Sequence, residues 1–487
     1  MEKTRGVIMV NYETLRSPIK FCSVKLSEVI ANSIRLDAYS YNIEAKQARD
    51  IIEHGKYKSI FLNDLIKKAY YPGRFKRIYC SPKKGYPFYL PSQMNDVYPK
   101  TDKYISHLTN CNIDELRLKK ETLLLTRSGT IGTISLVSQT IEGNIFSDDV
   151  IRITFKDNYD LGYVYAYLKN SIGNKILVTN SYGAVINHIE PEHLKAIPIP
   201  GAPLQIKKRI NDLIVKSYDL RDEANLLVDE ATKMLMEELR FPNIYNFEKV
   251  IYNKNKVNTF NVRLSNLEER LDASYHTPII SAIIEHMKKY AGEVTTVGDK
   301  RVSQKIILPG RFKRFYVEEG KGKIFIGGKQ IGELNPTNKK YLSLTHHADR
   351  INKQLTLHER MTLITCSGTI GKVTLVGKHW ENWAASQHII RIIPTNENIA
   401  GYLSIFLASD YGHQLITRYT YGSVVNEIDD NHVSNIPFPI LKNKSIQKNI
   451  NDIALKANEK KYEAYKKEQE ALRIMEEEVL VQDRESN

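Results

Sequence analysis

The 487-residue sequence has few cysteines and lacks the short motifs that most DNA-modifying enzymes carry. Its four cysteines lie far apart without a Cys-x-x-Cys pair, which is typical of reduced thiols and not of a disulfide framework. No Pro-Pro dipeptide occurs, so the catalytic tetrapeptide of amino-methyltransferases is missing, and no Gly-x-x-x-x-Gly-Lys-Ser/Thr phosphate loop is present. His188 and His193 do not have the spacing of a zinc-binding helix. We therefore expect no catalytic residue, no metal and no cofactor in this chain.

Long apolar runs are also missing. Nowhere do about 18 apolar residues follow one another, and the first residues lead into no apolar stretch long enough for a signal peptide. We expect a cytoplasmic protein without a membrane segment. Positive charge is abundant instead, because 70 Lys and Arg residues against 56 Asp and Glu give a formal net charge of +14. Such a balance favours a polyanionic partner, and we expect double-stranded DNA.

The strongest feature of the sequence is the tandem duplication of a whole domain. Four motifs return in the same order after 235 to 239 residues, a distance far beyond the roughly 20 to 50 residues of a solenoid repeat. The paired segments are 35–38 with 270–273, 72–77 with 309–314, 126–132 with 365–371, and 182–200 with 421–439. A protein with two copies of one binding unit usually reads two similar things at once.

Each copy ends in a proline-rich stop followed by a long helical pattern. The stops at 197–203 and 436–439 cannot continue a helix or a central strand, because proline lacks the backbone N–H. Beyond each stop, apolar residues recur at spacings of three and four, as in coiled coils. The predicted positions of the interface with partner subunits are Ile206, Ile210, Leu213, Leu220 and Leu227 in the first helix and Ile446, Ile450, Ile453 and Ile474 in the second.

These patterns predict an α+β protein with two homologous globular units of mixed β-sheet and helices, each followed by a long helix. We expect the two helices to pair as an antiparallel coiled coil with the units at its ends. The predicted segments are 1–203 for the first unit, 204–243 for the first helix, 244–261 for a linker, 262–443 for the second unit and 444–487 for the second helix. The alternative is two independent helices, each lying back on its own unit.

Two duplicated loops are the candidate DNA contacts. The first puts three cations around one aromatic after a Pro-Gly turn, and its identity in both copies favours phosphate binding over base reading. The second is a Ser-Gly-Thr-Ile-Gly turn, whose hydroxyls can bind a phosphate. The candidates are Arg74, Lys76, Arg77, Arg127, Ser128 and Thr130 in the first copy and Arg311, Lys313, Arg314, Ser367, Thr369 and Lys372 in the second. The alternative is a pair of solvated turns.

Base-reading residues are expected where the two copies diverge, because two stretches of DNA rarely have the same sequence. Residues 81–102 differ from 317–339, and Asp148-Asp149 differs from Gln387-His388. These segments are therefore the candidates for sequence discrimination.

The chain twice has the order of globular unit, proline-rich stop and long helix. In this order it resembles the specificity subunit of a type I restriction-modification system, and the resemblance covers this chain from about residue 26 to residue 478. The resemblance implies two target-recognition domains that each read one half of a split DNA sequence, and a helix pair that docks methyltransferase subunits, expected to be two. S-adenosylmethionine is then expected in those subunits. Whether a restriction subunit also joins stays open. The alternative is a stand-alone DNA-binding or scaffolding protein, such as a repressor or a defence component, and an unrecognised nuclease is a third possibility.

Overall fold

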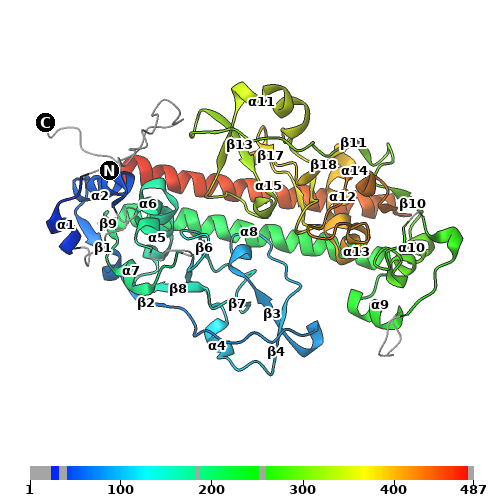
Figure 1. Cartoon of the computed structure of the whole chain (residues 1–487), viewed down its shortest axis with the longest axis horizontal. Helices are drawn as coiled ribbons and strands as arrows, with labels where there is room; N and C mark the ends of the chain where they lie inside the picture. Colours follow the sequence, from blue (N-terminus) through cyan, green and yellow to red (C-terminus); the bar gives the residue numbers. More distant parts are fainter. Residues whose placement is uncertain (1–22, 32–40, 182–186, 252–258, 269, 481–487) are drawn as a thin grey trace, which may run out of the picture.

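The structure is a computed structural model that describes residues 23–31, 41–181, 187–251, 259–268 and 270–480. The repeated motif at 35–38 and residues 182–186 of the longest repeat lie outside the described residues. Within them the chain forms two α+β units joined to two long helices, as predicted (Figure 1).

The two long helices, α8 (Leu204–Glu238) and α15 (Lys444–Ile474), lie against each other and are antiparallel (Figure 1). Ser217 Oγ donates to the carbonyl of Ala464 at 2.8 Å, whereas Glu223, later in α8, meets Lys460, earlier in α15, at 2.9 Å. At about 1.5 Å per residue, α8 is about 50 Å long. The predicted antiparallel pair is confirmed, and α15 continues into a π-helical turn, Met475–Val479.

The first unit contains a four-stranded antiparallel sheet and a smaller three-stranded sheet, in the orders β2-β8-β5-β6 and β4-β3-β7. Its strands are β1 (Ser59–Phe61), β2 (Ile66–Tyr70), β3 (Gly85–Tyr89), β4 (Tyr104–Ser106), β5 (Leu123–Thr126), β6 (Ile134–Leu136), β7 (Ile145–Phe146), β8 (Val150–Phe155) and β9 (Pro198–Pro200). Its helices are α1 (Leu26–Ala31), α2 (Ile43–Glu53), α3 (Leu62–Leu65), α4 (Ile113–Leu116), α5 (Tyr159–Lys169), α6 (Ser171–Thr179) and α7 (Pro191–Lys195).

The second unit repeats this plan with the sheets β11-β18-β15-β16 and β12-β14-β13-β17. Its strands are β10 (Glu293–Thr296), β11 (Ser303–Ile307), β12 (Tyr316–Val317), β13 (Gly322–Ile326), β14 (Lys340–Ser343), β15 (Thr362–Thr365), β16 (Val373–Leu375), β17 (Ala384–Ala385), β18 (Ile389–Pro394) and β19 (Pro437–Ile440). Its helices are α10 (Pro278–Tyr290), α11 (Leu344–Arg350), α12 (Glu397–Ala408), α13 (Asp410–Thr417) and α14 (Asp430–Ser434).

The proline-rich stops form the short strands β9 and β19, which pair only with β1 and β10. A two-stranded sheet tolerates proline because it has only edge strands. Tyr163 on α5 donates to the Pro200 carbonyl at 2.6 Å, and Tyr402 on α12 donates to the Pro439 carbonyl at 2.9 Å. These bonds hold each stop against its unit just before the long helix begins.

An Asn-Asp pair occurs near the start of each long helix, at 211–212 and 451–452, and close helix packing explains its asparagine. Asn211 Oδ1 accepts from the Gly162 amide at 3.0 Å, and Asn451 Oδ1 accepts from the Gly401 amide at 2.8 Å. A Cβ on Gly162 would lie 2.6 Å from the Asn211 Cα, so glycine is needed for this approach. Each unit is thereby fixed to its own long helix through α5 or α12.

Both long helices enter the cores of both units. Ile210 of α8 lies in the first core and Leu235 in the second, while Ile450 of α15 lies in the second core and Ile474 in the first. Each of these four side chains is at least 98% buried. The helices therefore pair with each other, as predicted, and are not independent, although each also packs against both units.

Most of the predicted interface positions are covered by this chain's own units. Ile206, Ile210, Leu213 and Ile474 pack in the first core, Ile446, Ile450 and Ile453 in the second, and Leu220 beside Ala464, while Leu227 is half-buried. Their assignment as a surface for partner subunits needs correction, because a side chain already inside a core is unavailable to a partner.

The predicted linker begins with a helix, α9 (Ile244–Ile251). Phe247 on α9 packs edge-on against His286 of α10, with ring centroids 5.6 Å apart, so this part of the linker is attached to the second unit. No helix in the described part of the chain is both long and apolar enough to cross a membrane.

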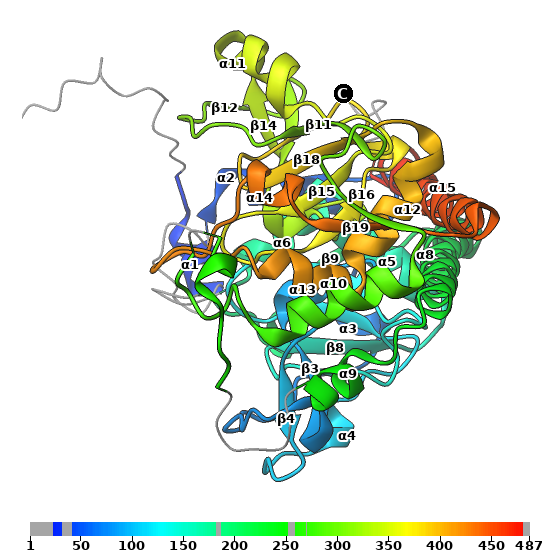
Figure 2. The same ribbon diagram turned by 90° about the vertical axis from the view of Figure 1, so that its right-hand side faces the viewer.

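Figure 2 shows α8 and α15 side by side along one edge of the molecule, with α11 of the second unit and β4 of the first at opposite extremes. The sequence predicts two units held apart at the ends of the helix pair. In the structure the units instead touch each other near the middle of the pair. The Val97 amide of the first unit donates to the Gly332 carbonyl of the second at 2.8 Å.

Candidate nucleic-acid interface

Four duplicated segments meet on the sheet of each unit. They are the basic loop (72–77 and 309–314), the glycine turn (126–132 and 365–371), the strand-entry segment before β8 or β18 (147–149 and 386–388), and the return segment (187–190 and 426–429). Segments that are distant in the sequence are thereby assembled into one surface, which we call the duplicated site.

In the first unit, arginines connect these segments. Arg77 of the basic loop donates to Asp148 at 2.8 Å, and Arg127 of the glycine turn donates to Glu190 of the return segment at 2.5 Å. The Arg127 amide also donates to the Asp149 carbonyl at 3.0 Å. The basic loop and the glycine turn are therefore both fixed to the strand-entry segment.

In the second unit, the same segments meet through different side chains. The Cys366 amide donates to the His388 carbonyl at 3.0 Å, which repeats the backbone contact of Arg127. Arg311 of the basic loop pairs with Glu427 of the return segment at 3.0 Å, and Ser367 Oγ lies 3.5 Å from the same carboxylate. The backbone arrangement is thus repeated, while the ion pairs differ.

The aromatic residue of each basic loop packs against a second ring from the unit below it. Phe75 lies edge-on to Phe88 with centroids 6.3 Å apart, and Phe312 lies edge-on to Phe325 at 6.5 Å. The last arginine of each loop lies over the second ring, Arg77 over Phe88 at 5.3 Å and Arg314 over Phe325 at 5.7 Å. The loop is therefore a supported platform for cations.

The exposed members of the predicted DNA-binding set lie at the tips of the loops. Arg74, Lys76, Arg311 and Lys313 are exposed, and so are Thr130 and Thr369 in the glycine turns, whereas Ser128 and Ser367 are half-buried. Arg311 remains 79% exposed despite its ion pair with Glu427. Exposed cations beside hydroxyl groups form a surface that can bind phosphates.

Three predicted contacts are used inside the chain, and Arg77, which pairs with Asp148, is the first of them. The Arg127 side chain is 8% exposed, and although burial would lower its pKa, the hydrogen bond to Glu190 raises it. Lys372 Nζ lies 2.7 Å from Asp96 of the first unit, in an ion pair between the units. Their placement in the DNA-binding set needs correction, because a phosphate would have to displace a carboxylate that is already bound.

The glycine turns need their glycines. Gly129 and Gly368 both have φ +77°, which other residues rarely adopt, and a Cβ there would meet no atom within 4 Å. Gly132 has φ +85°, and a Cβ there would lie 2.7 Å from Val178. The first glycine of each turn thus leaves open space at the tip, and the second permits close packing.

Sequence reasoning missed a duplicated buried arginine beneath the strand-entry segment. Arg152 is 2% exposed and donates to the carbonyls of Ser147 and Phe146 at 3.1 and 3.0 Å. Arg391 is fully buried and donates to the Ser386 carbonyl at 3.2 Å. Burial lowers the pKa of Arg152 to about 10 and that of Arg391 to about 9, so both remain charged at neutral pH. The sequence signal is one arginine in the same apolar strand of both copies.

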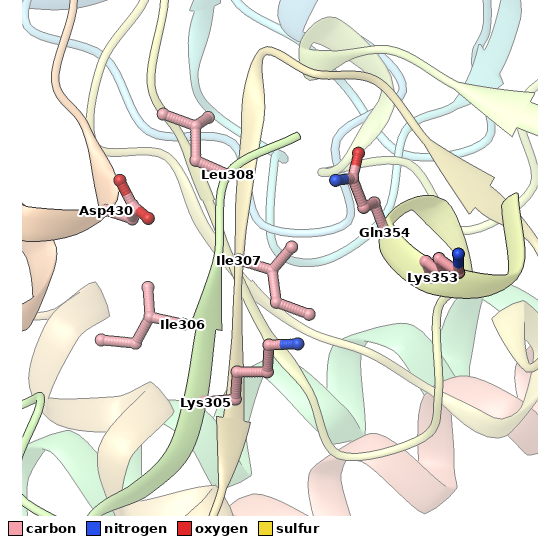
Figure 3. Close-up of a pocket in the computed structure, with 7 residues that line it drawn as sticks. All are labelled: Lys305, Ile306, Ile307, Leu308, Lys353, Gln354 and Asp430. Carbon is pink, nitrogen blue, oxygen red and sulfur yellow. The ribbon is translucent and has the colours of Figure 1, made fainter. Parts of the chain in front are cut away.

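A second missed pair is Lys68 and Lys305, equivalent exposed residues on the edge strands β2 and β11 just before the basic loops. Lys305 borders an open hollow of about 580 Å³ that Lys353 and Gln354 line from the facing turn (Figure 3). Lysines on edge strands also prevent unwanted strand pairing. Their position beside the loop adds positive charge to the duplicated site in both units.

In the described part of the chain, no three His, Cys, Asp or Glu side chains gather as a metal site. Residues 54–224 and 311–472 each match the family described as type I restriction modification DNA specificity domain. No protein of curated function matches the chain.

Among the solved structures that match the chain are two subunits of restriction-modification systems. The type I restriction-modification S subunit from M. genitalium is 14% identical over 88% of this chain and 95% of its own, with a TM-score of 0.33. The HsdS subunit from Thermoanaerobacter tengcongensis is 12% identical over 88% of this chain and 99% of its own, with a TM-score of 0.27.

Proposed function

Since the chain belongs to the type I restriction-modification DNA specificity domain family and is a DNA-recognition subunit, we propose that its two units read a split DNA sequence and direct methyltransferase subunits to it. The observation that carries the proposal is the assembly of the same four segments into one site in each unit. Two similar readers on one helix pair favour two short blocks separated by unread base pairs.

The chemistry of the duplicated site supports separate roles for its segments, with some residues binding phosphates and others discriminating bases. Exposed cations of the basic loops, Arg74 and Lys76 in one unit and Arg311 and Lys313 in the other, are suited to phosphates and hold the protein on DNA irrespective of sequence. The strand-entry segments have different side chains in the two units and are suited to base discrimination. One surface can thus supply both affinity and specificity.

The chain is proposed to be non-catalytic and to work with two methyltransferase subunits that bind S-adenosylmethionine. Support comes from the missing Pro-Pro tetrapeptide and from apolar side chains that remain exposed on α8. Leu226 is 62% exposed, Leu204 is 47% exposed and Val215 is 37% exposed on this helix. Such side chains offer a contact for partner helices, and a restriction subunit would join through the same assembly.

The test is methyl transfer from labelled S-adenosylmethionine to a library of duplexes, by the purified chain alone and after co-expression with a type I methyltransferase subunit from the same source. We expect transfer only in the complex, at a motif with two blocks. Transfer by the chain alone would sink the non-catalytic role. Sequence-specific binding without any retained methyltransferase would instead favour a stand-alone DNA-binding protein.

A further inference from the structure

We propose that Arg314 and Gln387 read a purine in the half-site bound by the second unit, whereas Asp148 withholds the equivalent Arg77 from DNA in the first unit. The inference rests on the proposed function, because it requires both units to bind DNA. It assigns different roles to residues in equivalent positions of the two copies.

The platform beneath these residues is the same in both units. Arg152 and Arg391 donate to equivalent carbonyls of the strand-entry segment, Ser147 and Ser386 among them, from inside the sheet. A buried guanidinium with several carbonyl acceptors fixes the backbone it bonds, because releasing it would leave a buried charge unpartnered. Side chains at positions 148 and 387 are therefore presented by one rigid geometry.

In the first unit the last arginine of the basic loop is held by an ion pair. Arg77 donates to Asp148 at 2.8 Å and to Ser147 Oγ at 3.1 Å. The Asp148 side chain is 7% exposed and that of Arg77 is 29% exposed, so the carboxylate of this ion pair is the shielded partner. Burial would lower the pKa of Arg77, but Asp148 raises it. Arg77 can therefore reach DNA only by leaving a buried carboxylate without a partner, which is costly.

In the second unit the acid is replaced by Gln387 and the arginine is released. No ion pair or hydrogen bond joins Arg314 to any residue in the described part of the chain, and its Nε is buried without a partner there. The Gln387 Oε1 is also buried without a partner among these residues, while Gln387 Nε2 lies 3.1 Å from His388 Nε2. Arg314 and Gln387 are both half-buried side chains that no carboxylate holds in the described part of the chain, so both can turn to a partner outside the chain.

The two side chains match the major-groove edge of a purine. Arginine makes two hydrogen bonds to guanine O6 and N7, and glutamine makes two to adenine N7 and N6. Phe325 beneath Arg314 orients the guanidinium, as aromatic faces do for cations. Both chemistries share the purine N7, so the second unit is suited to a purine at this position.

The test uses variants of the full chain in complex with its methyltransferase subunit. The probe is a library of duplexes with a randomised 40-base-pair insert, from which each complex selects its preferred sequence. Gln387→Asp copies the first unit and should lock Arg314, and Arg314→Lys keeps the charge but loses the paired donors. We expect each variant to reduce the purine preference in the second half-site by about 5- to 150-fold. The first half-site should be unchanged, which also shows that the variant is folded.

The reverse exchange tests the first unit. Asp148→Asn removes the carboxylate, and we expect a purine preference to emerge or sharpen in the first half-site only. If the half-sites selected by Gln387→Asp and Arg314→Lys are those of the wild type, the assignment of the second unit is wrong. If Asp148→Asn selects the same first half-site as the wild type, Asp148 does not withhold Arg77 from DNA. A wild-type chain that selects no split sequence would refute the proposed function itself.

Discussion

Asp96 and Glu333, which occupy equivalent positions in the two copies, lie opposite each other in an antiparallel backbone bridge between the units. Equivalent residues can meet in this way only where a twofold relation between the copies passes through the contact. The duplication therefore has a centre of approximate symmetry in this molecule. Beside it, the Val97 amide donates to the Gly332 carbonyl, which is a second direct contact between the units.

This central contact brings two carboxylates together. Lys372 Nζ lies 2.7 Å from Asp96, and burial nevertheless raises the pKa of Asp96 against the effect of that lysine. Burial also raises the pKa of Glu333 from its ordinary 4.5 to about 7, with Lys169 opposing the shift and Asp96 adding to it. The contact between the units is therefore sensitive to pH near neutrality.

The first prediction is that stability falls between about pH 5 and pH 8 through Glu333. Because the folded protein holds this proton more tightly, the contribution is complete below the unfolded pKa of 4.5 and is lost as the pH rises through 7. We expect Glu333→Gln to remove about 1 to 2 kcal/mol of pH dependence, reduced from the full shift by partial exposure. Urea unfolding at several pH values measures it, with the exposed Glu359→Gln as control. Parallel curves for wild type and Glu333→Gln would contradict it.

A second prediction concerns Glu468 on α15, which is 1% exposed and joins both helices and both units. It pairs with Arg221 of α8, accepts from Tyr165 of the first unit at 3.2 Å, and accepts from Asn335 of the second at 3.1 Å. Burial would raise the pKa of Glu468, but Arg221 and Lys169 lower it, so the carboxylate is charged.

Replacing it leaves Arg221 buried without its partner, and we expect Glu468→Ala to reduce the free energy of unfolding by about 3 to 5 kcal/mol. The matched control is Glu470→Ala on the same helix, whose side chain is 46% exposed and should change stability by less than about 0.5 kcal/mol. Chemical denaturation of the two variants makes the comparison, and equal losses would refute the central role of Glu468.

The duplication, the α+β class and the antiparallel helices could be predicted because their signals are local or repeat along the chain. The roles of Arg127 and Lys372 could not, since their acidic partners lie 63 and 276 residues away in the sequence. The sequence displayed the repeated arginine in β8 and β18 but not its burial. In the sequence, a cation that faces DNA cannot be distinguished from one that pairs with a carboxylate brought to it by folding.

A third prediction separates the cations of the first basic loop. Arg74 and Lys76 are exposed, so replacing either with alanine should weaken binding to all sequences and flatten the salt dependence by about 0.9 log unit per lost phosphate contact. Lys233→Ala is the control, because this lysine is 76% exposed on α8, away from the loop. Fluorescence anisotropy on one duplex at several salt concentrations gives the slopes. Unchanged affinity and slope in both loop variants would mean that the loop is only a solvated turn.

The last prediction asks what sets the distance between the two half-sites. Ser217 and Ala464 face each other across the helix pair. A heptad inserted just after Ser217 and another just before Ala464 therefore lie side by side, and the apolar residues between α8 and α15 stay in register. Each helix then gains about 10 Å of length, equivalent to about three base pairs of DNA.

The insertion also has to pull Asp96 away from Glu333, so some stability should be lost. We expect methylation maps of the complex to show the same two blocks with the spacer longer by a few base pairs. A matched single insertion, after Ser217 alone, misaligns the seam and should abolish specific methylation. If the double insertion leaves the spacer unchanged, the direct contact between the units, and not helix length, fixes the separation of the half-sites.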